Sequence, residues 1–147
     1  MNVAVGHTAS AEEAVRFLAD HPHVYLLGHR ADGYPTGYAM MSRAHDGVVD
    51  FSTYRASAKV RNLEREGVAA ILAVSKDDDQ ALWASGDVSV HDGALWNAER
   101  PRVGSDATFR PDVPQGIIDK VADRHETGKR CVLRVTLREA RFVDRPA

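Results

Sequence analysis

Two Asp-Gly dipeptides, Asp32-Gly33 and Asp46-Gly47, separate three short strand-like segments, and this spacing constrains the fold more than any other feature of the sequence. Asp-Gly readily adopts the positive φ angles of tight hairpin turns. The segments 23–30, 34–43 and 48–53 contain Val, Tyr, Thr and Phe side chains, which favour strands. Because such short turns join antiparallel strands, the sequence predicts a three-stranded meander here rather than a parallel β-α-β unit.

Three further strands and three helices complete the prediction. The strands are expected at 68–75, 81–91 and 131–142, where apolar residues run together or alternate with polar ones. The helices are expected at about 10–20, 57–66 and 114–126, and the stretch 93–112 favours an ordered loop or short helical turns. Six antiparallel strands of this length are enough to close a barrel. We therefore predict a single domain, residues 1–147, that is mainly β with peripheral helices.

Charge and cysteine content exclude several classes of protein. Lys and Arg number 19 and Asp and Glu number 21, so the net charge of -2 offers no global basic field for nucleic acid. No apolar run approaches the roughly 20 residues that span a bilayer, and the N-terminus has no secretory pattern. Cys131 is the single cysteine, which excludes an intrachain disulfide and a thiolate zinc cluster. For His21-Pro22-His23, a solvated turn is favoured over a metal site. We expect a soluble cytoplasmic domain.

The segment 51–63 passes from a strand into a helix and carries the clearest chemical signal. Arg55, Lys59 and Arg61 lie around the helix start, and the first turn contains no acid. The positive end of a helix dipole favours carboxylates, so cations gathered there indicate a bound anion. Backbone N–H groups, hydroxyls and basic side chains together make a phosphate site. The alternative is a solvated basic face whose charges are balanced further along by Glu64 and Glu66.

The stretch FSTYRASAKVRNLEREGVAAILAV, preceded by the two Asp-Gly hairpins, resembles the pyridoxamine 5'-phosphate oxidase-like FMN-binding split-barrel superfamily. The resemblance covers roughly residues 10–92 and is nearest to the flavin/deazaflavin oxidoreductases, with S-A-K-x-R-N-L as its most specific element. It implies a six-stranded antiparallel split β-barrel that binds FMN, or alternatively coenzyme F420. It also implies a homodimer with the site at the interface. Nucleic acid and membrane are not expected as partners, because of the charge balance and the short apolar runs.

The resemblance also implies which residues of this chain lie at the cofactor. The expected phosphate ligands are Ser52, Thr53, Ser57 and Lys59, with Arg61 and Asn62 in support. The residues expected beside the edge of the ring system are Met40, Met41 and Ser42. Trp83 is expected to help wall the pocket across the dimer interface.

Together these observations predict a flavin-dependent oxidoreductase that acts on a small organic substrate. The chain lacks the C-terminal Arg-x-His pattern of pyridoxamine phosphate oxidase itself, so the vitamin B6 reaction is not expected. F420 has an acidic tail, for which Arg55, Lys59, Arg61 and Arg65 could form a basic groove. FMN is favoured because the superfamily resemblance alone supports it.

No residue is assigned as the catalytic acid or base from the sequence. His29 and Tyr38 lie on strands that face the expected pocket and are the candidate proton donors. The alternative is a strand-end histidine and a tyrosine that packs in the barrel. A non-catalytic flavin or haem carrier is the competing function, with His29, His45 or His91 as a haem ligand. A barrel whose site has decayed, leaving a dimeric scaffold, is the third.

Overall fold

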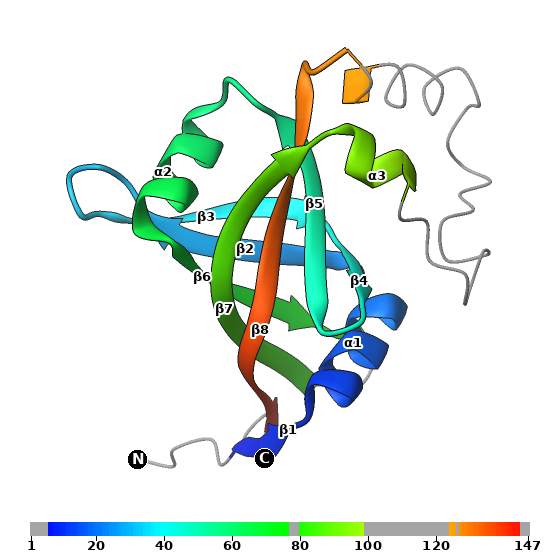
Figure 1. The fold of residues 1–147 in the computed structure, drawn as a ribbon. Helices are drawn as coiled ribbons and strands as arrows, with labels where there is room; N and C mark the ends of the chain where they lie inside the picture. The colour runs from blue at the N-terminus through cyan, green and yellow to red at the C-terminus, as the bar shows by residue number, and fades with distance from the viewer. Residues whose placement is uncertain (1–5, 77–79, 99–123, 126, 145–147) are drawn as a thin grey trace.

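The computed structural model describes residues 6–76, 80–98, 124–125 and 127–144. In these residues eight β-strands surround one core and three helices lie at its periphery (Figure 1). The strands are β1 (Gly6–Ala9), β2 (His23–His29), β3 (Pro35–Met41), β4 (Arg43–His45), β5 (Val48–Tyr54), β6 (Val68–Val74), β7 (Gln80–Asp92) and β8 (Arg130–Asp144). The helices are α1 (Ala11–Asp20), α2 (Ala58–Glu66) and α3 (Ala94–Ala98).

All strand pairs are antiparallel, in the order β3-β2-β6-β7-β8-β5-β4, with β1 added to β8. The long strands β7 and β8 curl so that the sheet closes around its own inner face (Figure 1). This is the mainly β, antiparallel barrel with peripheral helices that the sequence predicts. The strand count differs, because β1 was not expected and the expected strand 34–43 is divided into β3 and the start of β4.

The meander predicted for residues 23–53 is therefore only half correct. The β2–β3 hairpin forms, but β5 pairs with β4 and β8, and the described residues show no pairing between β3 and β5. The division falls at Ser42, which is buried and whose N–H and hydroxyl both donate to the Pro22 carbonyl, at 2.7 and 3.0 Å. The chain thus leaves one edge of the sheet after β3 and joins the other edge at β4.

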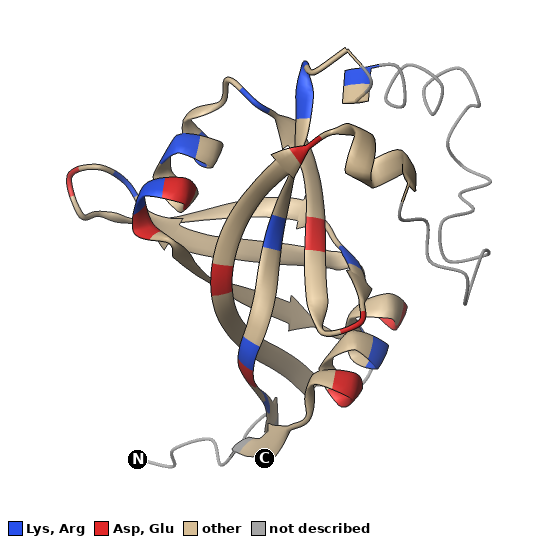
Figure 2. Cartoon of the chain, viewed as in Figure 1, with Lys and Arg blue, Asp and Glu red and all other residues tan. Residues whose placement is uncertain are grey.

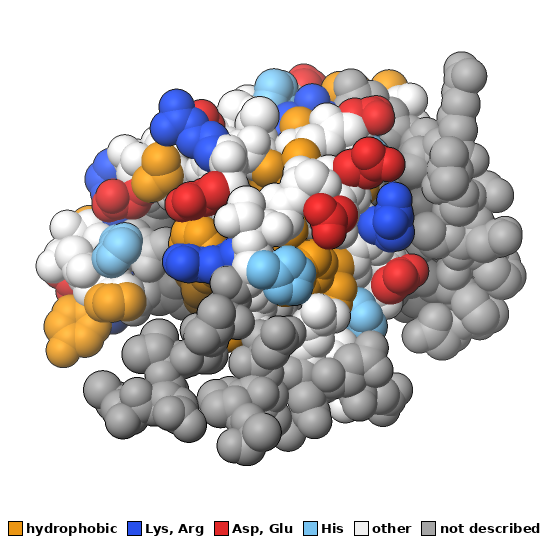
Figure 3. Space-filling view, turned by 90° about the horizontal axis from the view of Figure 1, so that it is seen from below, with side chains coloured by type: hydrophobic (Ala, Val, Ile, Leu, Met, Phe, Trp, Pro, Cys, Tyr) orange, Lys and Arg blue, Asp and Glu red, His pale blue; other side chains and the backbone are white. Residues whose placement is uncertain are grey.

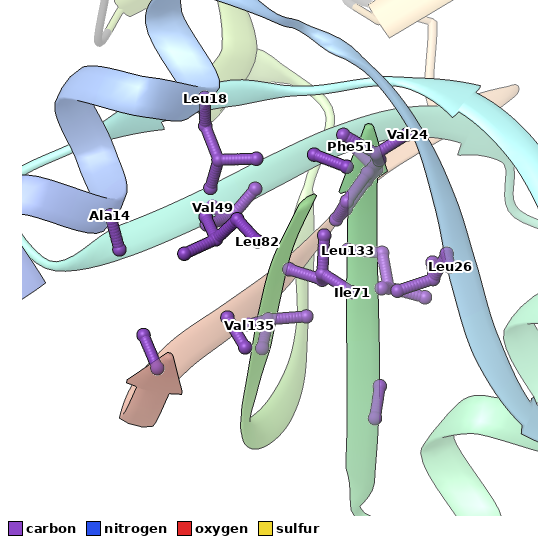
Figure 4. Close-up of a cluster of buried hydrophobic side chains, with 14 of the residues drawn as sticks. Ala14, Leu18, Val24, Leu26, Val49, Phe51, Ile71, Leu82, Leu133 and Val135 are labelled. Atoms are coloured by element: carbon purple, nitrogen blue, oxygen red, sulfur yellow. The ribbon is translucent and has the colours of Figure 1, made fainter. Parts of the chain in front are cut away.

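The core lies on the inner face of the curled sheet, where alternate strand residues meet. Figure 4 shows Phe51, Leu133, Leu26 and Ile71 pointing into it from four different strands. Helix α1 covers one end of the barrel with buried residues including Leu18, and α2 covers the other end with Val60 and Leu63. Each fully buried side chain of this size stabilises the fold by about 1.5–3 kcal/mol. Cys131 is fully buried in the same cluster, as its position on β8 predicts.

The helix ends follow the sequence signals. At α1, Ser10 and Glu13 form the reciprocal capping box. At α2, the Ser57 hydroxyl accepts from the N–H of Val60, and Gly67 ends the helix in the left-handed region with φ of 72°. Most of the helix predicted at 114–126 and of the stretch 93–112 lies outside the described residues. Within them, Arg124 and His125 are helical and α3 is a short helix.

Candidate functional site

Helix α2 begins with a concentration of positive charge. Its first turn contains no acid, and its N-terminal half carries Lys59 and Arg61 (Figure 2). Among the described residues neither side chain has a carboxylate partner, and Arg61 instead donates to the Ala56 carbonyl at 2.9 Å. Arg55 precedes the helix, and its N–H donates to the carbonyl of Lys129, the residue just before β8. On the face seen from below in Figure 3, acidic and basic side chains are mixed rather than gathered into one basic patch.

A short chain of hydrogen bonds ties α2 to the β2–β3 hairpin. The Asn62 Nδ2 donates to the Tyr38 hydroxyl at 3.3 Å, and Arg65 donates to Asn62 Oδ1 at 3.1 Å. Arg65 also donates to the carbonyl of His29 at 3.0 Å. The Lys59 Nζ lies 5.4 Å from the centre of the Tyr38 ring, within cation–π range. These contacts fix the orientation of the basic helix relative to the strands.

Beside the C-terminal end of α2, a groove of about 650 Å³ opens on the outer face of the sheet. It is lined by Leu27, Gly28, His29, Pro35, Thr36, Gly37, Val68, Ala69, Ala70 and Ser85. The hollow follows from register, because pairing places Gly37, Leu27, Ala70 and Ser85 in one row across four strands. Three of these four residues are small, so the sheet surface lies deeper there.

The next row across the same face is large and apolar. It begins at Ala39, runs through Tyr25, Leu72 and Trp83 and ends at Arg141, whose guanidinium lies 4.7 Å from the centre of the Trp83 ring. These bulky side chains lie next to the row of small ones but are not among the residues that line the groove, whose own lining is mostly apolar and small. The groove therefore suits a flat apolar group that lies along the sheet.

The structure brings four of the predicted site residues together. These are Ser57, Lys59, Arg61 and Asn62, all within the N-cap and first half of α2. Trp83 lies on the outer sheet face, two residues along β7 from the groove residue Ser85. Four of these residues thus lie on α2, which precedes the groove residue Val68 and contributes none of the lining itself, and Trp83 lies on β7, which contributes Ser85.

The other predicted site residues lie elsewhere. Ser52 and Thr53 are neighbours on β5 and point to opposite faces, and Thr53 is buried. Met40 packs against the barrel core, and the Ser42 hydroxyl donates a hydrogen bond to the Pro22 carbonyl. Met41 is half-buried at the end of β3, where it pairs with His23 across the sheet.

Ser52 belongs to a separate polar cluster on the outer face of β5 and β8. Its hydroxyl lies 2.6 Å from Nε2 of His125, which is fully buried, and accepts from Arg130 Nε at 2.9 Å. The His125 ring stacks on Trp96 of α3 with ring centres 5.7 Å apart, and the Arg43 guanidinium lies 3.4 Å from the centre of the Trp96 ring. This cluster attaches α3 and the residues before β8 to the barrel.

The sequence reasoning missed the groove and this cluster. The small residues Gly37 and Ala70 carry no chemical signal, and only strand register shows that they share a row. His45 and His91, considered as haem ligands, have Nε2 within hydrogen-bonding distance of Asp50 and Ser89, at 3.0 and 2.7 Å. Over the described ranges, no three His, Cys, Asp or Glu side chains gather closely enough to hold a metal ion. None of the helices described has the length and hydrophobicity to span a bilayer.

Comparisons with known proteins identify the fold. No protein-family model matches the sequence, and no curated protein matches it. Among solved structures, the chain is similar to an F420 reductase, with a TM-score of 0.59 at 18% identity over 85% of this chain and 94% of that one. It is also similar to the conserved hypothetical protein Rv2991 from Mycobacterium tuberculosis, with a TM-score of 0.66 at 23% identity over 92% and 85% of the two chains.

A third similar structure is a pyridoxamine 5'-phosphate oxidase-related, FMN binding protein from Nostoc punctiforme PCC 73102. It has a TM-score of 0.59 at 16% identity over 91% of this chain and 80% of that one. At these identities the likeness concerns the fold. It confirms the split-barrel fold of pyridoxamine 5'-phosphate oxidase-like proteins that the sequence resemblance implies.

Proposed function

We propose that this chain binds FMN and acts as an oxidoreductase on a small organic substrate. The observation that carries the proposal is the pairing of two features at α2: a cationic N-terminal half and a groove beside its C-terminal end. An FMN molecule has a phosphate and a flat ring system, which require these two kinds of surface. The fold is shared with proteins described as FMN-binding and as an F420 reductase, which supports the same proposal.

The ring requires a flat floor, and the groove meets this requirement. A Cβ atom at Gly37 would lie 3.1 Å from Cδ2 of Leu27, so the surface at this position is already closely packed. Ala70 and Ser85 continue the floor with small side chains. The groove thus has room for an aromatic ring without rearrangement of the strands.

The phosphate requires donors, and the start of α2 provides them. Lys59 and Arg61 have no carboxylate partner among the described residues, and the Ser57 hydroxyl and the first backbone N–H groups lie beside them. Nine helical residues span about 13 Å, so the phosphate site and the groove lie at the two ends of one helix. When bound, the flavin supplies hydride transfer, and the protein orients it and excludes water.

Coenzyme F420 is the alternative cofactor of the same site. Its acidic tail would require more cations than a single phosphate does, and Arg55 and Arg61 lie exposed on the helix and the segment before it. The chain shares its fold with an F420 reductase at 18% identity. The choice between the two cofactors is made by comparing their affinities directly.

The deciding experiment is a fluorescence titration of the purified chain with FMN and with F420. We expect micromolar binding of FMN, and a loss of about tenfold or more in affinity for Lys59→Ala, because one charge-assisted phosphate contact is removed. Lys76→Ala, an exposed lysine after β6, is the matched control and should bind as the wild type does. Binding of neither cofactor, or equal affinities for Lys59→Ala and the wild type, would contradict the proposal.

A second substitution tests the groove independently of the charge. Ala70→Leu places a bulky side chain on the groove floor, so cofactor binding should be lost while the barrel stays folded. Ala81→Leu makes the same change on the same face of the sheet, outside the groove lining. Circular dichroism of both variants checks the fold, and equal FMN affinities in the two would exclude the groove as the ring site.

A further inference from the structure

His29 is distinct among the residues that line the groove. Of the ten lining residues it alone has an ionisable side chain, since the others are apolar or carry a hydroxyl group. It is the last residue of β2, exposed, and it pairs across the strands with Pro35. By strand alternation its side chain lies on the same face as Leu27, which forms part of the groove floor.

The backbone at His29 is held although the residue is exposed. Arg65 of α2 donates to its carbonyl at 3.0 Å. The hairpin that follows is closed by Arg30, which donates to Asp32 at 3.2 and 2.6 Å through its side chain and to the Tyr34 carbonyl through its N–H. Because these bonds hold the backbone of His29, its side chain has a fixed starting point relative to a molecule in the groove.

The carboxylates around the groove are occupied by other partners. Asp32 binds Arg30, and this hydrogen bond holds the pKa of Asp32 below its usual value. On the neighbouring elements, Glu66 pairs with Arg65, Asp87 pairs with Arg138, and Glu139 accepts from Ser85. Histidine is the side-chain type that changes charge between about pH 5 and 8. Among these groups, His29 is therefore the one whose side-chain type is suited to donate a proton to a molecule in the groove.

We propose that His29 is the proton donor for substrates reduced in the groove. This inference rests on the proposed function. Reducing a double bond of an unsaturated substrate by two electrons adds one hydride and one proton. A bound reduced flavin would provide the hydride and the two electrons, and the protonated His29 imidazole would give its proton to the substrate atom that becomes negatively charged. His29 then regains a proton from water, to which it is exposed.

The proposal also defines the class of substrate. Among the described residues, the groove lining contains no lysine and no arginine, so this lining provides no fixed charge for a phosphate or carboxylate group. A flat, uncharged molecule with a polarised double bond, such as a quinone, fits these walls.

The test uses His29→Gln, with His23→Gln as the matched control at the other end of β2. The first readout is nuclear magnetic resonance of the histidine ring protons during FMN addition. The His29 signal should shift and the His23 signal should shift less. The second is anaerobic single-turnover oxidation of bound reduced FMN by menadione across pH 5 to 9, with protein in excess so that the flavin stays bound.

The expected result is a rate that falls as pH rises through the titration range of histidine in the wild type and in His23→Gln. In His29→Gln the rate should be about 100-fold lower at low pH and independent of pH, with the protein kept in sufficient excess that all the FMN is bound in each variant. FMN binding with a persistent pH dependence in His29→Gln would overturn the inference alone. No binding of FMN or F420 by the wild type would overturn the proposed function, and the inference with it.

Discussion

At the scale of single residues, the two serines Ser52 and Ser57 show how one residue type serves different purposes five positions apart. Ser57 caps α2 at its cationic end, where an anion would bind. Ser52 is held between His125 and Arg130 on the outer face of β5, and its hydroxyl is already engaged by both. The structure thus separates two residues that the resemblance groups as phosphate ligands.

Replacement of Ser52 by alanine should therefore change stability rather than cofactor affinity. Ser52→Ala removes hydrogen bonds to the buried His125 and to Arg130, so the free energy of unfolding should fall by about 1–3 kcal/mol. Ser89→Ala removes a similar contact to the half-buried His91 and should cost less. Urea unfolding measures both variants. A tenfold loss of FMN affinity in Ser52→Ala would instead place this hydroxyl at the phosphate.

Cys131 should be unreactive in the folded chain. Burial raises the pKa of its thiol above the usual value of about 9.0, so little thiolate is present at neutral pH. A thiol-specific colour reagent should react slowly with the native chain and rapidly in concentrated guanidinium. Because the pKa of the Cys131 thiol is higher in the folded chain than in the unfolded chain, the unfolded chain loses this proton first as the pH rises. The contribution of Cys131 to the free energy of unfolding is therefore fully present below about pH 9 and is lost above it. In Cys131→Ser, the free energy of unfolding should fall less steeply above about pH 9 than in the wild type.

At the scale of secondary structure elements, local sequence signals predicted the turns and helix ends correctly, but they did not predict which strands pair with β4 and β5. Asp46 and Gly47 have φ of 47° and 78°, as the hairpin signal requires. The break at Ser42 depends on the Pro22 carbonyl, which is 20 positions earlier, and no local pattern encodes that contact. The separation of β3 from β5 follows from the break and was therefore missed.

The end of α2 provides a prediction about backbone conformation. Gly67 has φ of 72°, and a Cβ atom at this position would meet no other atom within 4 Å. Gly67→Ala should therefore lower the free energy of unfolding by about 1–2 kcal/mol through the left-handed conformation alone. Gly67→Asn should lose less, because asparagine tolerates this conformation better. Thermal unfolding of the two variants distinguishes this cause from steric crowding, which would penalise the larger asparagine more than alanine.

At the scale of the whole molecule, one part of the candidate site, the basic half of α2, could be predicted from the sequence, and the other part, the groove, could not. Lys59 and Asn62 are three residues apart on a helix, so their common position follows from periodicity. The groove arises from four strands, with Gly37, Ala70 and Ser85 far apart in the sequence. Its shape depends on register and on which face of each strand is buried, and these are determined only when the sheet closes.

The outer face of the sheet also bears on assembly. Tyr25 is 53% exposed, and Val68 and Val74 are 54% and 53% exposed on the same face, next to the groove. Such contiguous apolar exposure marks an interaction surface. We propose that a second copy of the chain covers it, which would bury about 800 Å² per partner if the interface is of standard size. The groove would then be enclosed between two copies.

A charge on this face should therefore disrupt assembly and cofactor binding together. Tyr25→Glu would place two carboxylates in an apolar interface, so sedimentation should show a monomer at concentrations where the wild type is a dimer. Because a single copy leaves the groove open to water, FMN affinity should fall by about tenfold in the same variant. Tyr34→Glu, at the 67% exposed hairpin position, is the matched control and should change neither property. A monomeric Tyr25→Glu that binds FMN as tightly as the wild type would show that one copy forms the complete site.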